Sequence, residues 1–203
     1  AEAKALATNE YALVEGVVTF IDGRNIYIQD ETAGIDLFLN SNTVPSELMI
    51  GDKVSAYGKK AVYKGLIELS GINGSDEAQF SIISSGNELP LAVKTISEIL
   101  SDFEGSNSLQ STRVMIQNAE IGEINTTGNT TPSQGESSTI IYKVPALSEI
   151  SEGNNVNVIG VISCFNTVQI RVAQEGDITL VPGQITLSPA SLTFEYQELN
   201  GPS

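Results

Sequence analysis

Apolar and polar residues alternate along residues 25–39, which read NIYIQDETAGIDLFL. Successive side chains of a strand point to opposite faces, so the alternation predicts two strands with one apolar face and one polar or aromatic face. The ETAG segment supplies a turn, and the whole stretch predicts a β-hairpin. The expected inner face holds Ile26, Ile28, Ile35, Leu37 and Leu39, and the expected outer face holds Tyr27, Gln29, Asp36 and Phe38.

Further strands flank this hairpin in the first half of the chain. Residues 11–23, YALVEGVVTFIDG, combine β-branched residues with an Asp-Gly turn. Residues 51–72 predict two more strands, with the region 59–65 as their connection. Five strands that bend at Gly16 and Gly58, with little helix, favour a small closed barrel over an open sheet.

The second half of the chain repeats this plan with lower fidelity. Thr95 and Glu98 form a Thr-x-x-Glu capping box, which predicts the start of a helix with one apolar stripe. A strand is predicted at 112–124, a long polar loop at 125–138 and another strand at 139–147.

The end of each half carries the clearest internal repeat. Residues 152–172, EGNNVNVIGVISCFNTVQIRV, parallel residues 50–72, IGDKVSAYGKKAVYKGLIELSGI. Each segment has a Gly-polar opening, a Val-containing strand, a connection and a last strand. Two copies of one barrel are the economical interpretation.

Several segments also resemble known domains. The segments VEGVVTFIDGRNIYIQDETAGIDLFL and GDKVSAYGKKAVYKGLIEL resemble the OB-fold domains of secreted bacterial proteins, including those attached to extracellular nucleases. The second half, from LPLAVKTISEIL through STRVMIQNAEI, is similar to related tandem domains of unknown function in surface lipoproteins of the Bacteroidetes. The segment ITLSPASLTFEY is similar to the first strands of an immunoglobulin-like domain common in the same bacteria. The resemblance implies an extracellular or outer cell-surface location and names no catalytic residues.

We therefore expect an all-β protein with minor helix, built as two consecutive five-stranded OB-fold barrels and a C-terminal β extension. The expected boundaries are 1–88 for the first barrel and 89–183 for the second barrel with its introductory helix. Residues 184–203 are expected to form an incomplete immunoglobulin-like strand segment or tail.

The composition of the chain limits the kinds of catalytic, metal-binding and nucleic-acid-binding site that it can form. The 203 residues include 10 Lys and Arg, 25 Asp and Glu and no His, which gives a formal net charge of −15. The absence of His removes imidazole acid–base chemistry, Ser-His-Asp and Cys-His nucleophilic pairs, and most transition-metal sites. Binding to phosphate backbones depends on cations, so the charge disfavours nonspecific nucleic-acid binding. The single cysteine, Cys164, lies in an apolar run and is interpreted as a buried structural thiol.

The chain offers no sequence signal for a membrane span. Its apolar runs fall far short of the ~20 residues that cross a bilayer, and the opening AEAKALATNE lacks a signal pattern. We expect a soluble chain, while an upstream signal or lipid anchor stays open.

The ligand-binding candidates follow from the OB resemblance. OB barrels bind ligands across the outer face of their second and third strands and the flanking loops. Aromatic side chains there can stack on sugars or bases, and lysines can meet anions. The candidates are Tyr27, Gln29, Asp36 and Phe38 on that face, with Lys59, Lys60, Tyr63 and Lys64 on the connection between the last two strands.

Each candidate group has a structural alternative. Tyr27 and Phe38 can form a cross-strand pair that the neighbouring domain covers. The lysines can protect an exposed edge strand from pairing with another chain. The acidic segments 30–31 and 73–77 offer oxygens for Ca²⁺, but their spacing does not match an EF-hand. We expect no metal and no cofactor, and no enzyme, because no carboxylate pair stands out and a small filled barrel has no deep cleft.

Two hypotheses about function result. The first is a noncatalytic extracellular or cell-surface binding or adhesion module, with an unidentified ligand such as a glycan or a protein. The second is a structural spacer that links a membrane anchor to another functional domain. A third class, a nucleic-acid-binding accessory domain of an extracellular nuclease, predicts salt-sensitive DNA binding centred on Lys59, Lys60 and Lys64.

Overall fold

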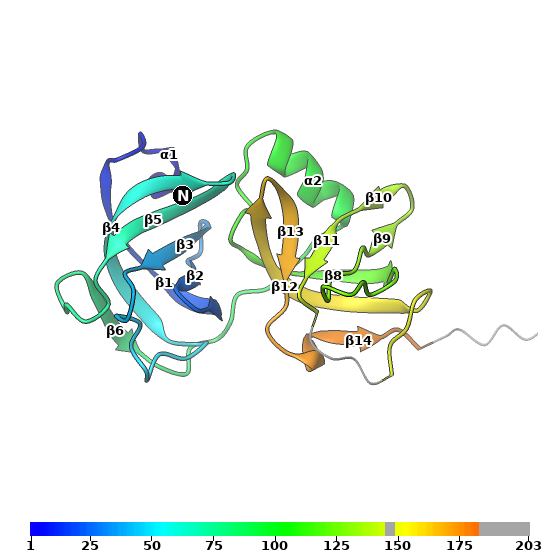
Figure 1. Ribbon diagram of the computed structural model, residues 1–203. Helices are drawn as coiled ribbons and strands as arrows, with labels where there is room; N and C mark the ends of the chain where they lie inside the picture. The colour runs from blue at the N-terminus through cyan, green and yellow to red at the C-terminus, as the bar shows by residue number, and fades with distance from the viewer. Residues whose placement is uncertain (145–148, 183–203) are drawn as a thin grey trace, which may run out of the picture.

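The computed structural model describes residues 1–144 and 149–182, which form two β-barrels that lie side by side (Figure 1). The extension predicted at 184–203 lies outside the described residues. A short helix, α1 (Glu2–Ala5), precedes the first barrel. Within the described ranges, no helix is long and apolar enough to cross a membrane.

The sheet of the first half has six strands: β1 (Tyr11–Asp22), β2 (Asn25–Gln29), β3 (Gly34–Leu39), β4 (Lys53–Tyr63), β5 (Leu66–Ile72) and β6 (Phe80–Ser84). β1 pairs with β2, β2 with β3, β3 in parallel with β5, β5 with β4, and β4 returns to β1. This closed five-stranded order is an OB-fold barrel, and β6 adds to β4 outside it.

Two long strands each change partners once, and these changes close the barrel. Val17 is the residue of β1 that pairs with both β2 and β4. Lys59 is the residue of β4 that pairs with both β1 and β5. A Cβ on Gly16 or Gly58, the residues just before them, would lie 3.1 or 2.8 Å from atoms of the neighbouring strand. The two predicted bends therefore fall where the strands change partners.

The interior of the first barrel is the apolar face predicted from the alternation. Ile26 and Leu37 are fully buried and face each other across β2 and β3. All five residues of the expected inner face belong to one buried cluster, namely Ile26, Ile28, Ile35, Leu37 and Leu39. That prediction is confirmed.

The second barrel is built from short and long strands with one helix. Its elements are β7 (Ala92–Val93), α2 (Ile96–Glu104), β8 (Arg113–Glu120), β9 (Ser133–Gln134), β10 (Ser137–Ser138), β11 (Ile140–Tyr142), β12 (Asn155–Phe165), β13 (Thr167–Arg171), the 3₁₀ turn η1 (Glu175–Asp177) and β14 (Ile178–Leu180). β12 pairs with β8 and β13, and β11 runs parallel to β13. β14 adds to β12 as β6 adds to β4, so the two barrels share one plan.

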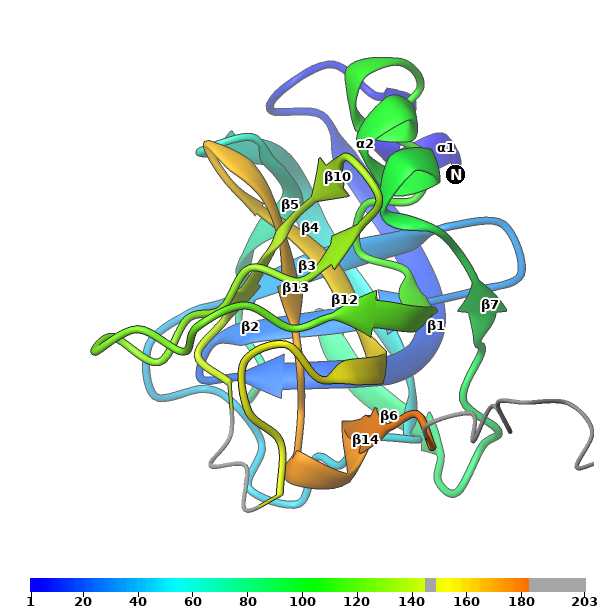
Figure 2. The same ribbon diagram turned by 90° about the vertical axis from the view of Figure 1, so that its right-hand side faces the viewer.

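The predicted repeat is confirmed at single residues. Gly51 and Gly153, which occupy matching places in the two copies, have φ of 92° and 84°. Lys64 and Asn166 also match, with φ of 51° and 62° at the two hairpin turns. Figure 2 shows these two hairpins, β4–β5 and β12–β13, converging at one side of the molecule.

The helix that introduces the second barrel begins at the predicted capping box. Thr95 Oγ1 accepts from the Glu98 N–H at 3.1 Å, and Glu98 Oε2 accepts from the Thr95 N–H at 2.7 Å. Ile96 and Ile99 are buried in the second core, with Leu100 and Phe103 packed partly against it.

Two predictions about connections are wrong. β4 continues through Tyr63, so Lys59, Lys60 and Tyr63 lie in a strand, and only Lys64 and Gly65 join β4 to β5. Adjacent lysines interrupt the apolar alternation that identifies a strand, so this end of β4 resembles a loop in sequence. The predicted loop 125–138 contains β9 and β10, whose Ser and Gln residues carry no apolar alternation that would identify a strand.

Candidate functional site

The outer face of the first barrel carries a row of residues in register across four strands. Phe20 pairs with Tyr27, Tyr27 with Asp36, and Asp36 with Glu68, across β1, β2, β3 and β5. All four residues are buried, with Tyr27 1% and Asp36 0% exposed. Residues that point away from a barrel interior can be buried only if something else covers them.

The second barrel supplies that cover. The Tyr27 hydroxyl and Ser163 Oγ, on β12, form a buried hydrogen bond of 2.7 Å. An apolar cluster that spans the two barrels consists of Phe20, Tyr27, Leu66, Val161 and Cys164. The outer face of β2, β3 and β5 is therefore an inter-barrel contact.

Glutamines fix the two backbones to each other at this contact. Gln29 Oε1 accepts from the Arg113 backbone N–H at 2.8 Å. Gln110 accepts from the Ile67 N–H at 2.7 Å and donates to the Gly65 carbonyl at 2.9 Å. These bonds give backbone groups of each barrel a side-chain partner in the other barrel.

Gly34 allows the backbones of the two barrels to approach closely. A Cβ at this position would lie 2.0 Å from the Ser111 carbonyl oxygen and 2.8 Å from the Thr112 nitrogen. Both atoms belong to the backbone and cannot move aside as a flexible side chain could. The contact therefore requires glycine at position 34.

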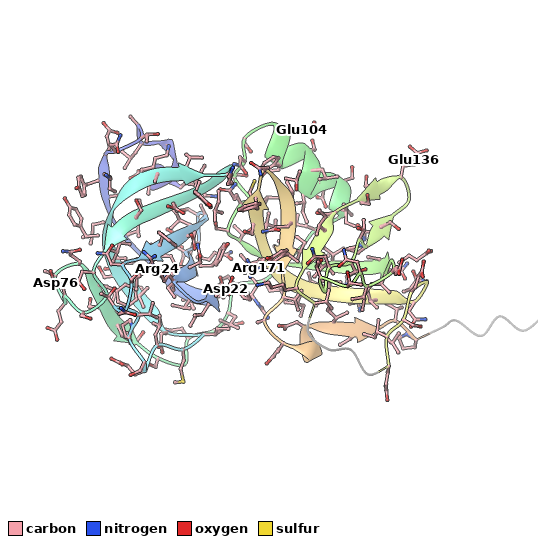
Figure 3. The ribbon with its side chains drawn as sticks, viewed as in Figure 1. Asp22, Arg24, Asp76, Glu104, Glu136 and Arg171 are labelled. Carbon is pink, nitrogen blue, oxygen red and sulfur yellow. The ribbon has the colours of Figure 1, made fainter. Side chains whose placement is uncertain are left out.

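Charged groups border the contact on two sides. Arg171, on β13, binds Asp22 with Nη2 and Oδ2 2.5 Å apart, and its guanidinium lies 5.4 Å from the Phe20 ring centre. Figure 3 shows Arg171 and Asp22 meeting between the barrels. On another side the Lys4 ammonium donates to the Ser108 and Gln110 carbonyls, at 3.1 and 2.5 Å.

The buried row holds ionisable groups in an apolar setting. Burial raises the pKa of the Asp36 carboxyl well above its usual range, against the effect of the Asn25 amide that donates to Oδ2 at 2.7 Å. Burial also raises the pKa of Glu68, although the charge of Arg24 opposes it. Burial likewise raises the pKa of Tyr27. Such shifts follow from removing the charged form from water.

The eight candidate residues do not form one exposed surface. Tyr27, Gln29 and Asp36 were candidates for ligand binding, but they lie in the inter-barrel contact. For Tyr27 the alternative, cover by the neighbouring domain, is the one that the structure shows. Phe38 is half-buried, with the Arg24 guanidinium 4.2 Å from its ring centre. The suggested Tyr27–Phe38 cross-strand pair is wrong, because the register places Phe38 opposite Asn25.

The lysine group is similarly divided. The Lys60 ammonium donates to the Lys4 and Leu6 carbonyls, which ties the N-terminal segment to β4. Lys53 lies 3.0 Å from Glu15 in an ion pair. Lys59 is half-buried, and only Lys64 is exposed at a turn.

The tips of the matching hairpins form a second surface, the hairpin junction, made of Tyr63, Lys64, Phe165 and Asn166. The rings of Tyr63 and Phe165 meet edge to face with centres 6.1 Å apart, and remain 57% and 52% exposed. The Lys64 carbonyl accepts from the Asn166 N–H at 2.6 Å. The sequence prediction missed Phe165, although the repeat that aligns it with Tyr63 was a usable signal.

The acidic segments proposed as alternative Ca²⁺ sites serve their own turns. Asp30 Oδ1 accepts from the backbone N–H groups of Thr32 and Ala33, both at 2.7 Å. Asp76 Oδ1 accepts from the Ala78 N–H at 3.0 Å. These oxygens are occupied by local hydrogen bonds, which is the usual use of Asp in turns.

An open groove of about 770 Å³ lies beside the first of these turns. Glu15, Asp30, Glu31 and Glu88 line it together with Lys53 and the apolar residues 89–91. Of the eight candidate residues only Gln29 reaches this groove, so sequence reasoning did not point to it.

Strand order and contacts define a two-barrel OB-fold protein in which the second barrel covers the usual ligand face of the first. No protein-family model matches the chain, and no curated protein matches it.

Solved structures similar to this chain include the following three, each with a low TM-score. The p204 HINb domain has 9% identity, covering 87% of this chain and 100% of its own, with a TM-score of 0.38. A murine DNA-binding protein bound to double-stranded DNA has 8% identity, covering 84% and 97%, with a TM-score of 0.36. The hypothetical protein ygiW from E. coli has 15% identity, covering 34% and 76%, with a TM-score of 0.30. Likeness this weak carries no argument about function, whereas the strand order of the chain itself defines the OB-fold barrel.

Proposed function

We propose that the protein is a noncatalytic structural module, in which two OB barrels are joined face to face to hold other parts of a larger protein at a set separation. The observation that carries this is the buried hydrogen bond between Tyr27 and Ser163. It lies at the centre of the face with which an OB barrel ordinarily binds its ligand. The second barrel of the same chain removes this face from water, which supports a role in packing the two barrels together.

The kind of contact supports the same function. It combines an apolar cluster, backbone hydrogen bonds from Gln29 and Gln110, and a glycine that only close packing requires. Contacts between loosely tethered domains are usually more polar and exposed. We further propose, from the resemblance of the sequence to surface domains of the Bacteroidetes, that the module works outside the cell and spaces a membrane anchor from another domain.

The test compares Tyr27→Phe with Tyr63→Phe. Removing the buried hydroxyl leaves Ser163 Oγ without its partner, and we expect a loss of about 1–2 kcal/mol of stability. Tyr63 is exposed, so its hydroxyl should contribute little. Chemical unfolding measures the stability of both variants, and small-angle X-ray scattering measures whether the barrels stay together.

Ligand binding provides the contrary outcome. If Tyr27→Phe left stability unchanged but removed binding of the complete protein to a glycan or protein array, the face would be a ligand site. The structural proposal would then be wrong.

The hairpin junction favours a second candidate function, ligand binding. Tyr63 and Phe165 come from different barrels and expose their rings together, beside Lys64. Exposed aromatic rings stack on sugars and bases. The double variant Tyr63→Ala/Phe165→Ala should abolish such binding without unfolding the protein. Binding to oligonucleotides that falls steeply with salt and needs Lys59 and Lys64 would favour the nuclease-accessory class.

A further inference from the structure

We propose that the contact between the two barrels is proton-linked: Asp36 is held in it as the protonated acid beside Glu68, so that acidic pH closes the contact and alkaline pH opens it. This rests on the proposed structural function, because it assumes that the inter-barrel contact forms in solution.

The geometry around Asp36 leaves one carboxyl oxygen without a partner. Oδ2 accepts from the Asn25 amide at 2.7 Å, whereas Oδ1 is buried and has no hydrogen bond to any residue that the structure describes. A buried charge costs far more free energy than a buried neutral acid unless it is paired. The unpartnered oxygen is therefore the natural place for a proton.

The neighbours of Asp36 on its own barrel add to this effect. Glu68 on β5 is its register partner, and Tyr27 on β2 is its partner on the other side. A second carboxylate at close range disfavours the charge on the first, while a phenol brings no cation. Arg24 stabilises the charge of Glu68.

Among the residues that the structure describes, no group that approaches from another element forms an ion pair with Asp36. Arg171 of β13 favours the charged form of Asp36, but it is already bound to Asp22 at the end of β1. Asp22 in turn disfavours the charge. Ser163 on β12 meets Tyr27, not Asp36.

The direction of the linkage follows from the raised pKa of Asp36. In the closed contact the pKa lies well above the ordinary Asp value of 3.8, to which it returns when the barrels separate. Between these two values the open form binds fewer protons than the closed form. Closure is therefore fully favoured below the ordinary pKa and weakens as pH rises to the pKa of the closed state.

The lone cysteine gives a direct reading of this opening. Cys164 is buried in the apolar cluster that spans the two barrels, 3% exposed, so a maleimide reagent reaches it when they separate. The chain contains no other cysteine. Thiol ionisation also changes with pH, but it is common to every variant, so the ratio of two labelling rates cancels it.

The experiment measures Cys164 labelling rates of the full chain between pH 4 and pH 8, as the ratio of wild type to Asp36→Asn. Asn keeps an acceptor for Asn25 and cannot ionise. We expect this ratio to rise by up to about tenfold per pH unit over part of the range, the limit for release of one proton. Glu104→Gln, an exposed carboxylate on α2, should behave as wild type at every pH.

The possible failures can be told apart. Rates as fast as in denaturant for both proteins at all pH values would overturn the inter-barrel contact itself. Slow rates with a constant ratio would keep the contact and overturn the proton linkage. Slowing of the wild type alone by added Ca²⁺ would show a cation in place of the proton, which also overturns it. If Asp36→Asn does not fold, Glu68→Gln serves instead and should flatten the pH profile in part.

Discussion

Two outer faces of the first barrel have a similar sequence pattern and different surroundings. On β2, β3 and β5, Tyr27 and Asp36 are buried against the second barrel. On β1 and β4, Tyr11 and Tyr57 stack with ring centres 5.3 Å apart and stay 60% and 42% exposed. Each face presents at least one tyrosine on the outward side of a strand. An aromatic outer face therefore does not by itself distinguish a working surface from an internal contact.

The largest expected effect comes from Gly34→Val. Its Cβ would overlap the Ser111 backbone, so the contact can form only after both segments move. We expect each barrel to keep its strands while the contact opens, because the clash lies between barrels. Circular dichroism should be unchanged, the radius of gyration should rise, and Cys164 should label at the rate of an open molecule.

Gly176→Ala is the matched control for this substitution. A Cβ there would meet no atom of the described residues within 4 Å. If Gly176→Ala opened the contact as much as Gly34→Val does, close approach at position 34 would not be the cause.

The next largest effect is expected from truncating one tyrosine on each of the two outer faces. Tyr27→Ala removes a buried ring and should cost about 3–5 kcal/mol of stability, as truncation of large buried side chains does. Tyr57→Ala removes an exposed ring and should cost no more than about 1 kcal/mol. Urea unfolding of both variants measures the difference. Equal losses would mean that the two faces are equivalent in solution.

The smallest effect on stability is expected at the exposed edge of the inter-barrel contact. Asp22→Asn breaks the pair with Arg171, in which the Asp22 side chain is about half exposed, so the loss should stay below about 1 kcal/mol. It should disappear at high salt, because salt screens exposed charges. Glu15→Gln breaks the Lys53 pair within the first barrel and should leave Cys164 labelling unchanged. If Asp22→Asn lost stability to the same extent at every salt concentration, the Asp22–Arg171 pair would be acting as a buried ion pair.

The features that were predicted correctly from the sequence are those that a single strand or the end of a single helix encodes. The inner face of residues 25–39, the capping box at Thr95 and the repeat of Gly51 at Gly153 all follow from local periodicity or turn chemistry. Each depends on neighbours within a few positions along the chain. The hairpin at 133–138 was not predicted, because its polar residues carry no such periodicity.

The candidate site could be located but not interpreted. The sequence placed Tyr27, Gln29 and Asp36 on the outer face of the first barrel, and the structure does so as well. Tyr27 and Gln29 bind Ser163 and Arg113, which lie more than 80 residues away along the chain. The sequence offered cover by the neighbouring domain as an alternative for Tyr27, but no local pattern identifies these partners, so the altered acidity of Asp36 could be learned only from the folded chain.

The short connector between the barrels has a consequence for how strong the contact must be. Only residues 85–91 separate β6 from β7. A short tether holds two partners at an effective concentration on the order of 1 mM. A contact with an intrinsic dissociation constant of about 0.1 mM would then stay closed roughly nine tenths of the time. The two barrels can therefore remain joined through an interface that would be too weak to hold two separate molecules together, and that can open without unfolding either barrel.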